Sequence, residues 1–132
     1  MGKSQRTKGH SWERGFARLL REKVFTDCPE DVHRGQQAHN PNDPDVSAPC
    51  WRFECKVGKA PSVWAALQQL KEDGDKANDT FNFRAVAIKK DRTEPFVAIP
   101  LDDFLELLQN WWRESAYNAI APNAIIAPRD FG

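Results

Sequence analysis

The sequence predicts an α/β protein in which a mixed central β-sheet is flanked by helices. Three observations favour this class: an amphipathic helical pattern near the start, several short apolar runs with strand character, and a second helical pattern between those runs. The predicted order of elements is α-β-β-β-α-β-β-α. At 132 residues, the chain is expected to form one domain, 1–132, with a hydrophobic core of its own.

The first helix is predicted from about residue 9 to residue 23. Its apolar side chains recur at helical spacing and would form one stripe: Trp12, Phe16, Leu19 and Leu20. Glu13 lies at the edge of this stripe. Basic side chains on the remaining surface would face water or a partner: Arg14, Arg18 and Arg21. Residues 1–8 are expected to be a flexible basic arm.

A loop over residues 25–31 precedes a first predicted strand, Val32 to Gln37. The polar, proline-bearing stretch 39–44 reads as a turn or loop and leads to Asp45, on or beside the next strand. From Trp51 to Lys56, apolar and charged residues alternate with the period of a strand. Glu54 and Lys56 therefore project from the same face.

The second half of the chain predicts a helix, a hairpin and a further helix. Ser62 is a plausible cap for a helix that runs to about Glu72. Two short β-rich runs, 83–88 and 95–99, are joined by a polar turn and read as a hairpin. Apolar spacing then indicates a helix from 101 to 112, and the tail 115–132 is expected to be irregular.

Composition and charge limit the possible functions. Nineteen basic and 19 acidic residues give a net charge of zero, but residues 1–26 carry seven basic against two acidic side chains. Smaller basic clusters occur at Arg52, Lys56 and Lys59 and at 89–92. A phosphate-binding face needs local positive charge rather than a high overall charge, so the neutral net charge does not exclude one. The first residues lack the apolar core expected of a signal peptide, and the sequence contains neither a membrane-length apolar run nor a nucleotide-cradling glycine loop. We expect a soluble cytoplasmic protein without a nucleotide cofactor.

Two carboxylates and an ammonium group are predicted to converge around the alternating strand. Asp45 and Glu54 offer the hard oxygen ligands that Mg²⁺ prefers, and the backbone carbonyl of Cys55 is a natural third ligand. Lys56 could hold the attacking water or contact a phosphate. Glu13 would complete the site through a metal-bound water if its helix packs nearby. This set is the equipment of a metal-dependent phosphodiesterase.

These motifs resemble the PD-(D/E)XK nuclease superfamily, and within it the small Holliday junction resolvases of the archaeal Hjc type and their bacteriophage relatives. The resemblance runs from about Lys8 to about Leu108. It implies a restriction-endonuclease-like core and places the catalytic roles on four residues: Glu13, Asp45, Glu54 and Lys56. It also implies one or two Mg²⁺ ions per site, for which Mn²⁺ would substitute.

The resemblance carries further residues onto DNA. The segment Arg34-Gly35-Gln36-Gln37 is similar to a polar strand that lies close to DNA in phage members. The residues expected to contact DNA are Lys8, Arg14, Arg34, Gln36, Gln37 and Lys59. Gln69, in the helix after the motif strand, resembles a glutamine whose amide supports the site.

The leading interpretation is a homodimeric Mg²⁺-dependent endonuclease that makes paired nicks in four-way DNA junctions, of viral or prophage origin and active in DNA recombination. Two alternatives remain: a nuclease for other branched or duplex DNA, and a DNA-binding or assembly module with an inert site. Trp111 and Trp112 are adjacent, so one of them could contribute an apolar side to a dimer interface.

Overall fold

The computed structural model describes residues 3–35, 43–77 and 81–116. The chain divides into two compact units, Met1–Ile99 and Pro100–Gly132, which are described separately. The first unit contains, in order, α1 (Lys3–Lys23), a 3-10 turn (Pro29–Asp31), β1 (His33–Arg34), β2 (Val46–Ala48), β3 (Trp51–Gly58), α2 (Val63–Ala77), β4 (Phe83–Lys90) and β5 (Phe96–Ala98). The second contains α3 (Leu101–Trp111) and a helical turn (Trp112–Ala116). The predicted α/β class and order of elements are confirmed.

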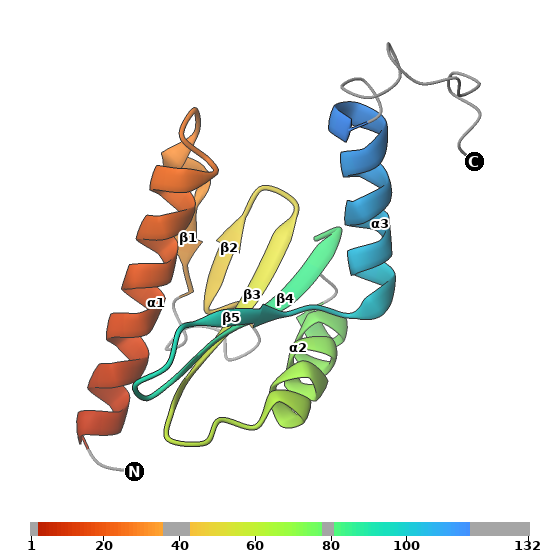
Figure 1. Ribbon diagram of the computed structural model, residues 1–132. Coiled ribbons are helices and arrows are strands. Elements are labelled where there is room, and N and C mark those ends of the chain that lie inside the picture. Colours follow the sequence, from red (N-terminus) through yellow and green to blue (C-terminus); the bar gives the residue numbers. More distant parts are fainter. Residues whose placement is uncertain (1–2, 36–42, 78–80, 117–132) are drawn as a thin grey trace. The chain divides into compact units, whose positions relative to one another are not determined.

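The five strands form one mixed sheet in the order β1-β2-β3-β4-β5 (Figure 1). Neighbouring strands are antiparallel except for the central pair, β3 and β4, which is parallel. A parallel pair needs a crossover connection, and α2 supplies it. The two longest strands of the sheet are therefore neighbours at its centre.

Helices α1 and α2 cover opposite faces of this sheet. In the parallel register Phe53 pairs with Ala85 and Glu54 pairs with Val86, so successive residues of β3 face α1 and α2 in turn. The α1 face carries an apolar cluster with Phe16 and Phe53, and the α2 face a smaller cluster with Val86. The candidate site residues of β3 thus lie on the less apolar α2 face.

The apolar stripe predicted for α1 packs as expected. The rings of Phe16 and Phe53 meet edge to face with centroids 5.0 Å apart, and the indole N–H of Trp12 donates to the Ala87 carbonyl at 3.0 Å. The helix begins at Lys3, so residues 3–8, expected as a flexible basic arm, are instead its first turns. These residues include no proline, and the Lys8 ammonium bonds Asp91 on the β4–β5 turn at 3.2 Å.

Other boundaries differ by a few residues. β1 covers only His33 and Arg34 of the expected strand 32–37, while Gln36 and Gln37 lie outside the described residues. α2 runs to Ala77, past the expected end at Glu72. Of the expected irregular tail, residues 115 and 116 are helical and 117–132 lie outside the described residues. Within the part of the chain described here, no helix has the length and apolar character to cross a membrane.

The second unit is an amphipathic helix followed by a widened turn. Asp102 and Asp103 lie in the first turn of α3, where acidic side chains interact favourably with the helix dipole. Its large apolar side chains are exposed: Leu101, Phe104, Leu105, Leu108 and Trp111. The rings of Trp111 and Trp112 have centroids 6.5 Å apart. The dimer role suggested for this pair stays a prediction.

Candidate functional site

The pairing of β2 with β3 brings the two predicted ligands together. Val46 pairs with Phe53 in the antiparallel register, so one more step places Asp45 opposite Glu54. Opposed side chains share a face of the sheet with Cβ atoms about 4.5–5.5 Å apart. Both residues are buried, with 6% and 3% of their surfaces exposed respectively. Two carboxylates from separate strands thus meet in the interior.

Backbone bonds fix the position of Asp45. Its Oδ2 accepts the backbone N–H of Cys55 at 2.9 Å, and its carbonyl accepts the N–H of Gly35 at 2.9 Å. Asp45 is thus held from both sides, by the backbone of β3 and by the residue that follows β1.

Gly35 allows β1 to approach the Asp45 loop closely. A Cβ atom at this position would overlap the carbonyl oxygen of Pro44, which is a backbone atom. Only glycine fits without a shift of the segment that carries Asp45. The sequence places Gly35 in the segment expected near DNA, but it does not reveal this role. The available signal was a lone glycine inside the strand predicted from Val32 to Gln37.

The two buried carboxylates interact strongly. The pKa of Glu54 is raised to about 8, first by burial, then by the negative charge of Asp45 and by a hydrogen bond between the two side chains. Glu54 Oε1 is buried and accepts no hydrogen bond from the described residues. Its cationic neighbour is Arg52, whose Nη2 lies 3.7 Å away. Without another cation, one of the two carboxylates retains a proton at neutral pH.

Arg52 does not belong to the basic surface to which the sequence assigned it. Its side chain is fully buried, on the same face of β3 as Glu54. The strand alternation that places Glu54 and Lys56 on one face also applies to Arg52. The sequence contained this signal, but a basic residue near two others was interpreted as a surface cluster.

Glu13 is a third carboxylate beside the pair. It projects from α1, and its side chain is only 13% exposed. Burial, followed by the charge of Asp45, raises the pKa of Glu13, while its bond with Arg34 opposes this shift. Arg34 Nη2 lies 3.3 Å from Glu13 Oε1. The predicted approach of the first helix to the site is therefore present in the structure.

The thiol of Cys55 is surrounded by the same three acids. Burial raises its pKa, and the charges of Asp45, Glu13 and Glu54 raise it further, in that order. A thiol in these surroundings stays protonated and unreactive. Cys55 packs against the α1-side core, as the sequence predicted, and its backbone is the part available for site chemistry.

Lys56 and Gln69 are paired. Lys56 Nζ donates to Gln69 Oε1 at 2.9 Å, which links β3 to α2. The positive charge of Lys56 acts on Glu54 and lowers its pKa. The ammonium group is thus held by an uncharged acceptor close to the acidic pair, with further donors left for water or phosphate.

The donor set fits a hard cation that keeps part of its hydration shell. Among the described residues, no group of three or more His, Cys, Asp or Glu side chains is arranged to hold a metal ion. Asp45 and Glu54 together with the Cys55 carbonyl offer three oxygen ligands, and water would complete an octahedron, as is usual for Mg²⁺. A cation would bind the buried Glu54 Oε1, which accepts no hydrogen bond from the described residues, and would displace the proton shared by the acidic pair.

The residues predicted to contact DNA are less concentrated. Lys8 forms an ion pair with Asp91, and Arg34 forms one with Glu13. Arg14 and Lys59 are exposed. Gln36 and Gln37 cannot be placed, since they fall outside the described ranges. The structure therefore brings Arg34 close to the acidic site through its ion pair with Glu13.

Comparison with known proteins gives no match: no family model, curated protein or solved structure matches this chain.

Proposed function

We propose that this chain is a Mg²⁺-dependent DNA endonuclease with a restriction-endonuclease-like core, and that its substrate is a four-way DNA junction. The observation that carries the proposal is the contact between the buried carboxylates of Asp45 and Glu54. Burying two acids against each other costs stability. A purely structural pair would have this cost without any function. Binding of a divalent cation would give the two carboxylates a function.

The acidic residues would hold the ion. Asp45 and Glu54 would be direct ligands, the Cys55 carbonyl a third, and Glu13 would act through water. When bound, one or two Mg²⁺ ions would orient the phosphate, activate water and stabilise developing negative charge. Mn²⁺ also accepts oxygen ligands and should substitute.

Lys56 would orient the attacking water. Its ammonium group has three donors, one of which is used by Gln69. The others can hold a water molecule beside the carboxylate pair and contact the scissile phosphate as negative charge develops. Gln69 would position the ammonium group without neutralising its charge.

A homodimer would match the symmetry of the substrate. A four-way junction has two-fold symmetry, and two sites related by a two-fold axis can cut it at equivalent positions. Each protomer would supply one complete site, since the proposed ligands all come from one chain. Paired nicks would follow from two coordinated cuts.

The test is cleavage of a synthetic four-way junction and of a linear duplex of matched sequence, each with Mg²⁺. Asp45→Asn and Glu54→Gln should each abolish cleavage, because each removes a ligand charge while keeping the shape of the side chain. Asp43→Asn is the matched control, since it changes a neighbouring acid two residues from Asp45. It should retain cleavage.

Each outcome separates the candidates. Equal rates on the junction and the duplex would reject the junction assignment and leave a nuclease for other DNA. Cleavage that survives both Asp45→Asn and Glu54→Gln would show that the site is elsewhere. A parent protein that binds junctions but cuts no DNA with Mg²⁺ or Mn²⁺ would be an inert binding module.

A further inference from the structure

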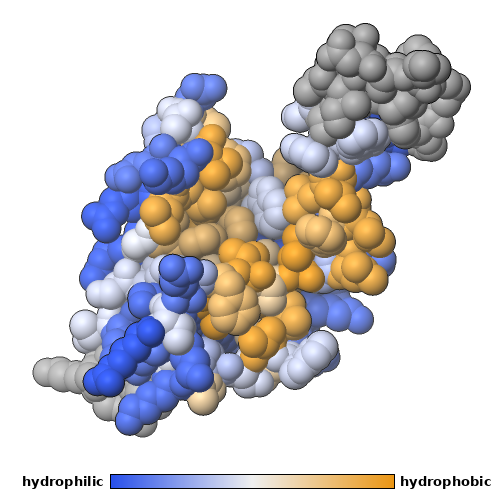
Figure 2. All heavy atoms as spheres, viewed as in Figure 1, coloured by the Kyte–Doolittle hydropathy of each residue, from blue (hydrophilic) through white to orange (hydrophobic). Residues whose placement is uncertain are grey.

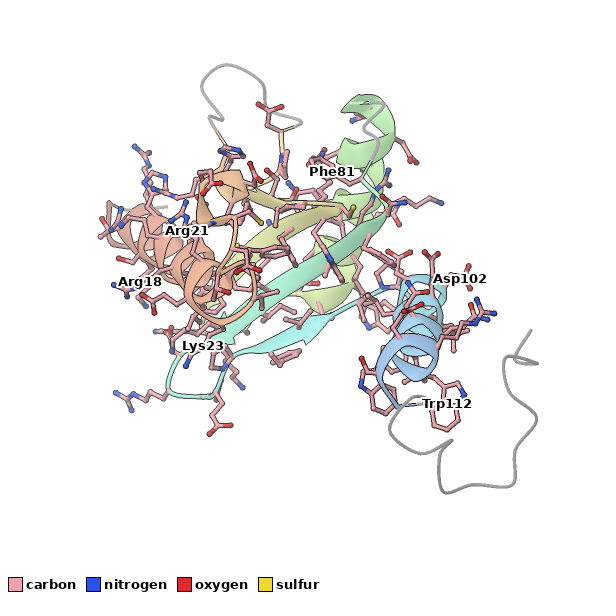
Figure 3. All side chains as sticks on the ribbon, turned by 90° about the horizontal axis from the view of Figure 1, so that it is seen from above. Arg18, Arg21, Lys23, Phe81, Asp102 and Trp112 are labelled. Carbon is pink, nitrogen blue, oxygen red and sulfur yellow. The ribbon has the colours of Figure 1, made fainter. Side chains whose placement is uncertain are left out.

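One side of α1 forms a basic groove of about 430 Å³. Four arginines, one serine and one glycine line it: Ser11, Arg14, Gly15, Arg18, Arg21 and Arg34. No lining residue is acidic. Figure 3 labels Arg18 and Arg21 on this helix, and Figure 2 shows that the outer side of α1 is hydrophilic. We call these six residues the arginine groove.

The spacing of the arginines costs the helix stability. Arg14, Arg18 and Arg21 recur at intervals of four and three, so they are neighbours on one helix face. Like charges at such spacing destabilise an isolated helix. Packing of α1 on the sheet does not require them, because the apolar stripe with Trp12 and Phe16 makes that contact. A ligand of opposite charge would offset the repulsion.

Most of these guanidinium groups are available to such a ligand. Arg21 donates to the Val32 carbonyl at 2.8 Å, and Arg14 donates to the Ser11 hydroxyl at 3.3 Å. These bonds orient the side chains but leave their charges unneutralised. Across the described parts of the chain, Arg34 is the one member of the groove with an acidic partner.

The floor of the groove is open at Gly15. A Cβ atom built there would meet no other atom within 4 Å. The Cβ atom of a larger residue would therefore fit at this position without displacing any protein atom. Glycine in a helix interior costs about 1 kcal/mol relative to alanine, and here it keeps space free beside the arginines.

The groove reaches the carboxylate site through the ion pair of Arg34 with Glu13. We propose that the arginine groove binds consecutive backbone phosphates of the DNA strand that enters the Asp45–Glu54 site. Arg14 and Arg21 are separated along α1 by about 10 Å, which equals the axial rise of about three phosphates of one strand, ~3.4 Å each, when α1 lies parallel to the duplex axis. This inference rests on the proposed function, and it adds the path of the substrate strand.

The test measures binding of the full chain to a labelled four-way junction by anisotropy at several NaCl concentrations. All proteins carry Asp45→Asn, so that no DNA is cut. Arg14→Gln/Arg18→Gln should weaken binding at least tenfold near 0.1 M salt and reduce the slope of log K against log salt by about 2. Lys71→Gln/Lys76→Gln removes the same charge from α2 and should leave the slope nearly unchanged.

A second pair of variants keeps all four arginines. Gly15→Glu and Gly15→Gln add side chains of similar size, and both residues favour helix over glycine. The glutamate would place a negative charge where a phosphate is expected, so it should weaken binding several times more than the glutamine. Circular dichroism and thermal unfolding would verify that both variants fold.

The outcomes separate failure of the groove proposal from failure of the proposed nuclease function. Equal salt slopes for the arginine and lysine doubles, or equal binding by the two Gly15 variants, would overturn the groove even if the parent cuts junctions. A reduced slope for the arginine double would support the groove even if the parent cuts nothing, and the failure would then belong to the proposed function.

Discussion

The carboxylate of Asp45, just before β2, lies opposite that of Glu54 on β3; both residues are buried, and their side chains share a hydrogen bond. Such a bond requires a proton on one of them. The pKa of Glu54 is accordingly raised to about 8. The pair thus has two ways to remain buried: it can keep the proton, or it can exchange it for a metal cation.

Thermal stability without divalent ions should fall as the pH rises from about 4.5 to about 8. In this window the folded chain holds a proton on Glu54 that the unfolded chain has released, since the pKa rises from 4.5 to about 8 on folding. The free energy of unfolding therefore decreases with pH, by up to about 1.4 kcal/mol per pH unit. Unfolding in EDTA between pH 5 and 9 measures this.

Two comparisons isolate the pair as the cause. Glu54→Gln cannot titrate and should flatten the decline. Mg²⁺ at about 100 times its dissociation constant should restore about 2.7 kcal/mol at pH 8, and less at pH 5, where protons compete. A parent protein whose stability is the same at pH 5 and pH 8, with and without Mg²⁺, would contradict the cation-for-proton argument.

Gly35→Ala should damage the site, although it adds one methyl group. The new Cβ would overlap the Pro44 carbonyl oxygen, and relief requires a shift of the segment leading to Asp45. We expect a loss of about 1–3 kcal/mol in the free energy of unfolding and weaker Mg²⁺ binding by calorimetry.

Gly9→Ala is the matched control for this substitution. A Cβ at Gly9 meets nothing within 4 Å, and the residue lies inside α1. Alanine there should stabilise the chain by up to about 1 kcal/mol and leave Mg²⁺ binding unchanged. If the two alanine variants behave alike, the close approach of Gly35 to Pro44 has no role in holding Asp45.

The elements with strong periodicity could be predicted from the sequence. The apolar stripe of α1 and the alternation through β3 determine which face each residue occupies, and the structure confirms both. The approach of Asp45 to Glu54 could be predicted from the number of residues between them. In an antiparallel pair, each step back along one strand is matched by one step forward along the other.

The remaining features depend on contacts between segments that are distant in sequence. The alternation through β3 places Arg52 on the same face as Glu54, but the full burial of Arg52 depends on packing against that face, which no local pattern reveals. Gly35 is constrained by the Pro44 carbonyl, which only the folded β1–β2 pairing brings near. The first turns of α1 include Lys8, which bonds Asp91, a residue 83 positions away in the chain.

Gln69→Leu should lower the rate of junction cleavage more than it lowers stability. It removes the acceptor of the Lys56 ammonium group, which would then lose its fixed position beside the carboxylates. We expect kcat to fall by about tenfold with little change in KM, because the lost interaction acts on the reacting water. An exposed hydrogen bond contributes about 1 kcal/mol or less to stability.

Gln68→Leu provides the comparison for that experiment. Gln68 is the preceding residue of α2 and donates to Glu72 at 2.9 Å within the same helix. Its replacement removes a similar exposed bond without touching Lys56. Equal kcat values for the two variants would mean that Gln69 does not position the lysine.

Arg52→Met should destabilise the chain more at pH 8 than at pH 5. The guanidinium is fully buried and lies 3.7 Å from Glu54 Oε1, where it offsets the negative charge of the acidic pair. Removal of one partner from a buried pair costs about 3–5 kcal/mol. At pH 5 Glu54 is protonated, so the loss should be smaller there. Urea unfolding at both pH values measures the difference.

Arg84→Met is the control for Arg52→Met, because Arg84 is the same residue type in a more exposed environment. It pairs with Arg52 across β3 and β4, but its ion pair with Asp75 is partly exposed to solvent. Arg84→Met should therefore cost about 1 kcal/mol or less, with little dependence on pH. Adding Glu54→Gln to Arg52→Met should recover part of the loss, because the carboxylate that Arg52 contacts is then uncharged. A double variant no more stable than Arg52→Met would show that the arginine acts through packing rather than through the charge of Glu54.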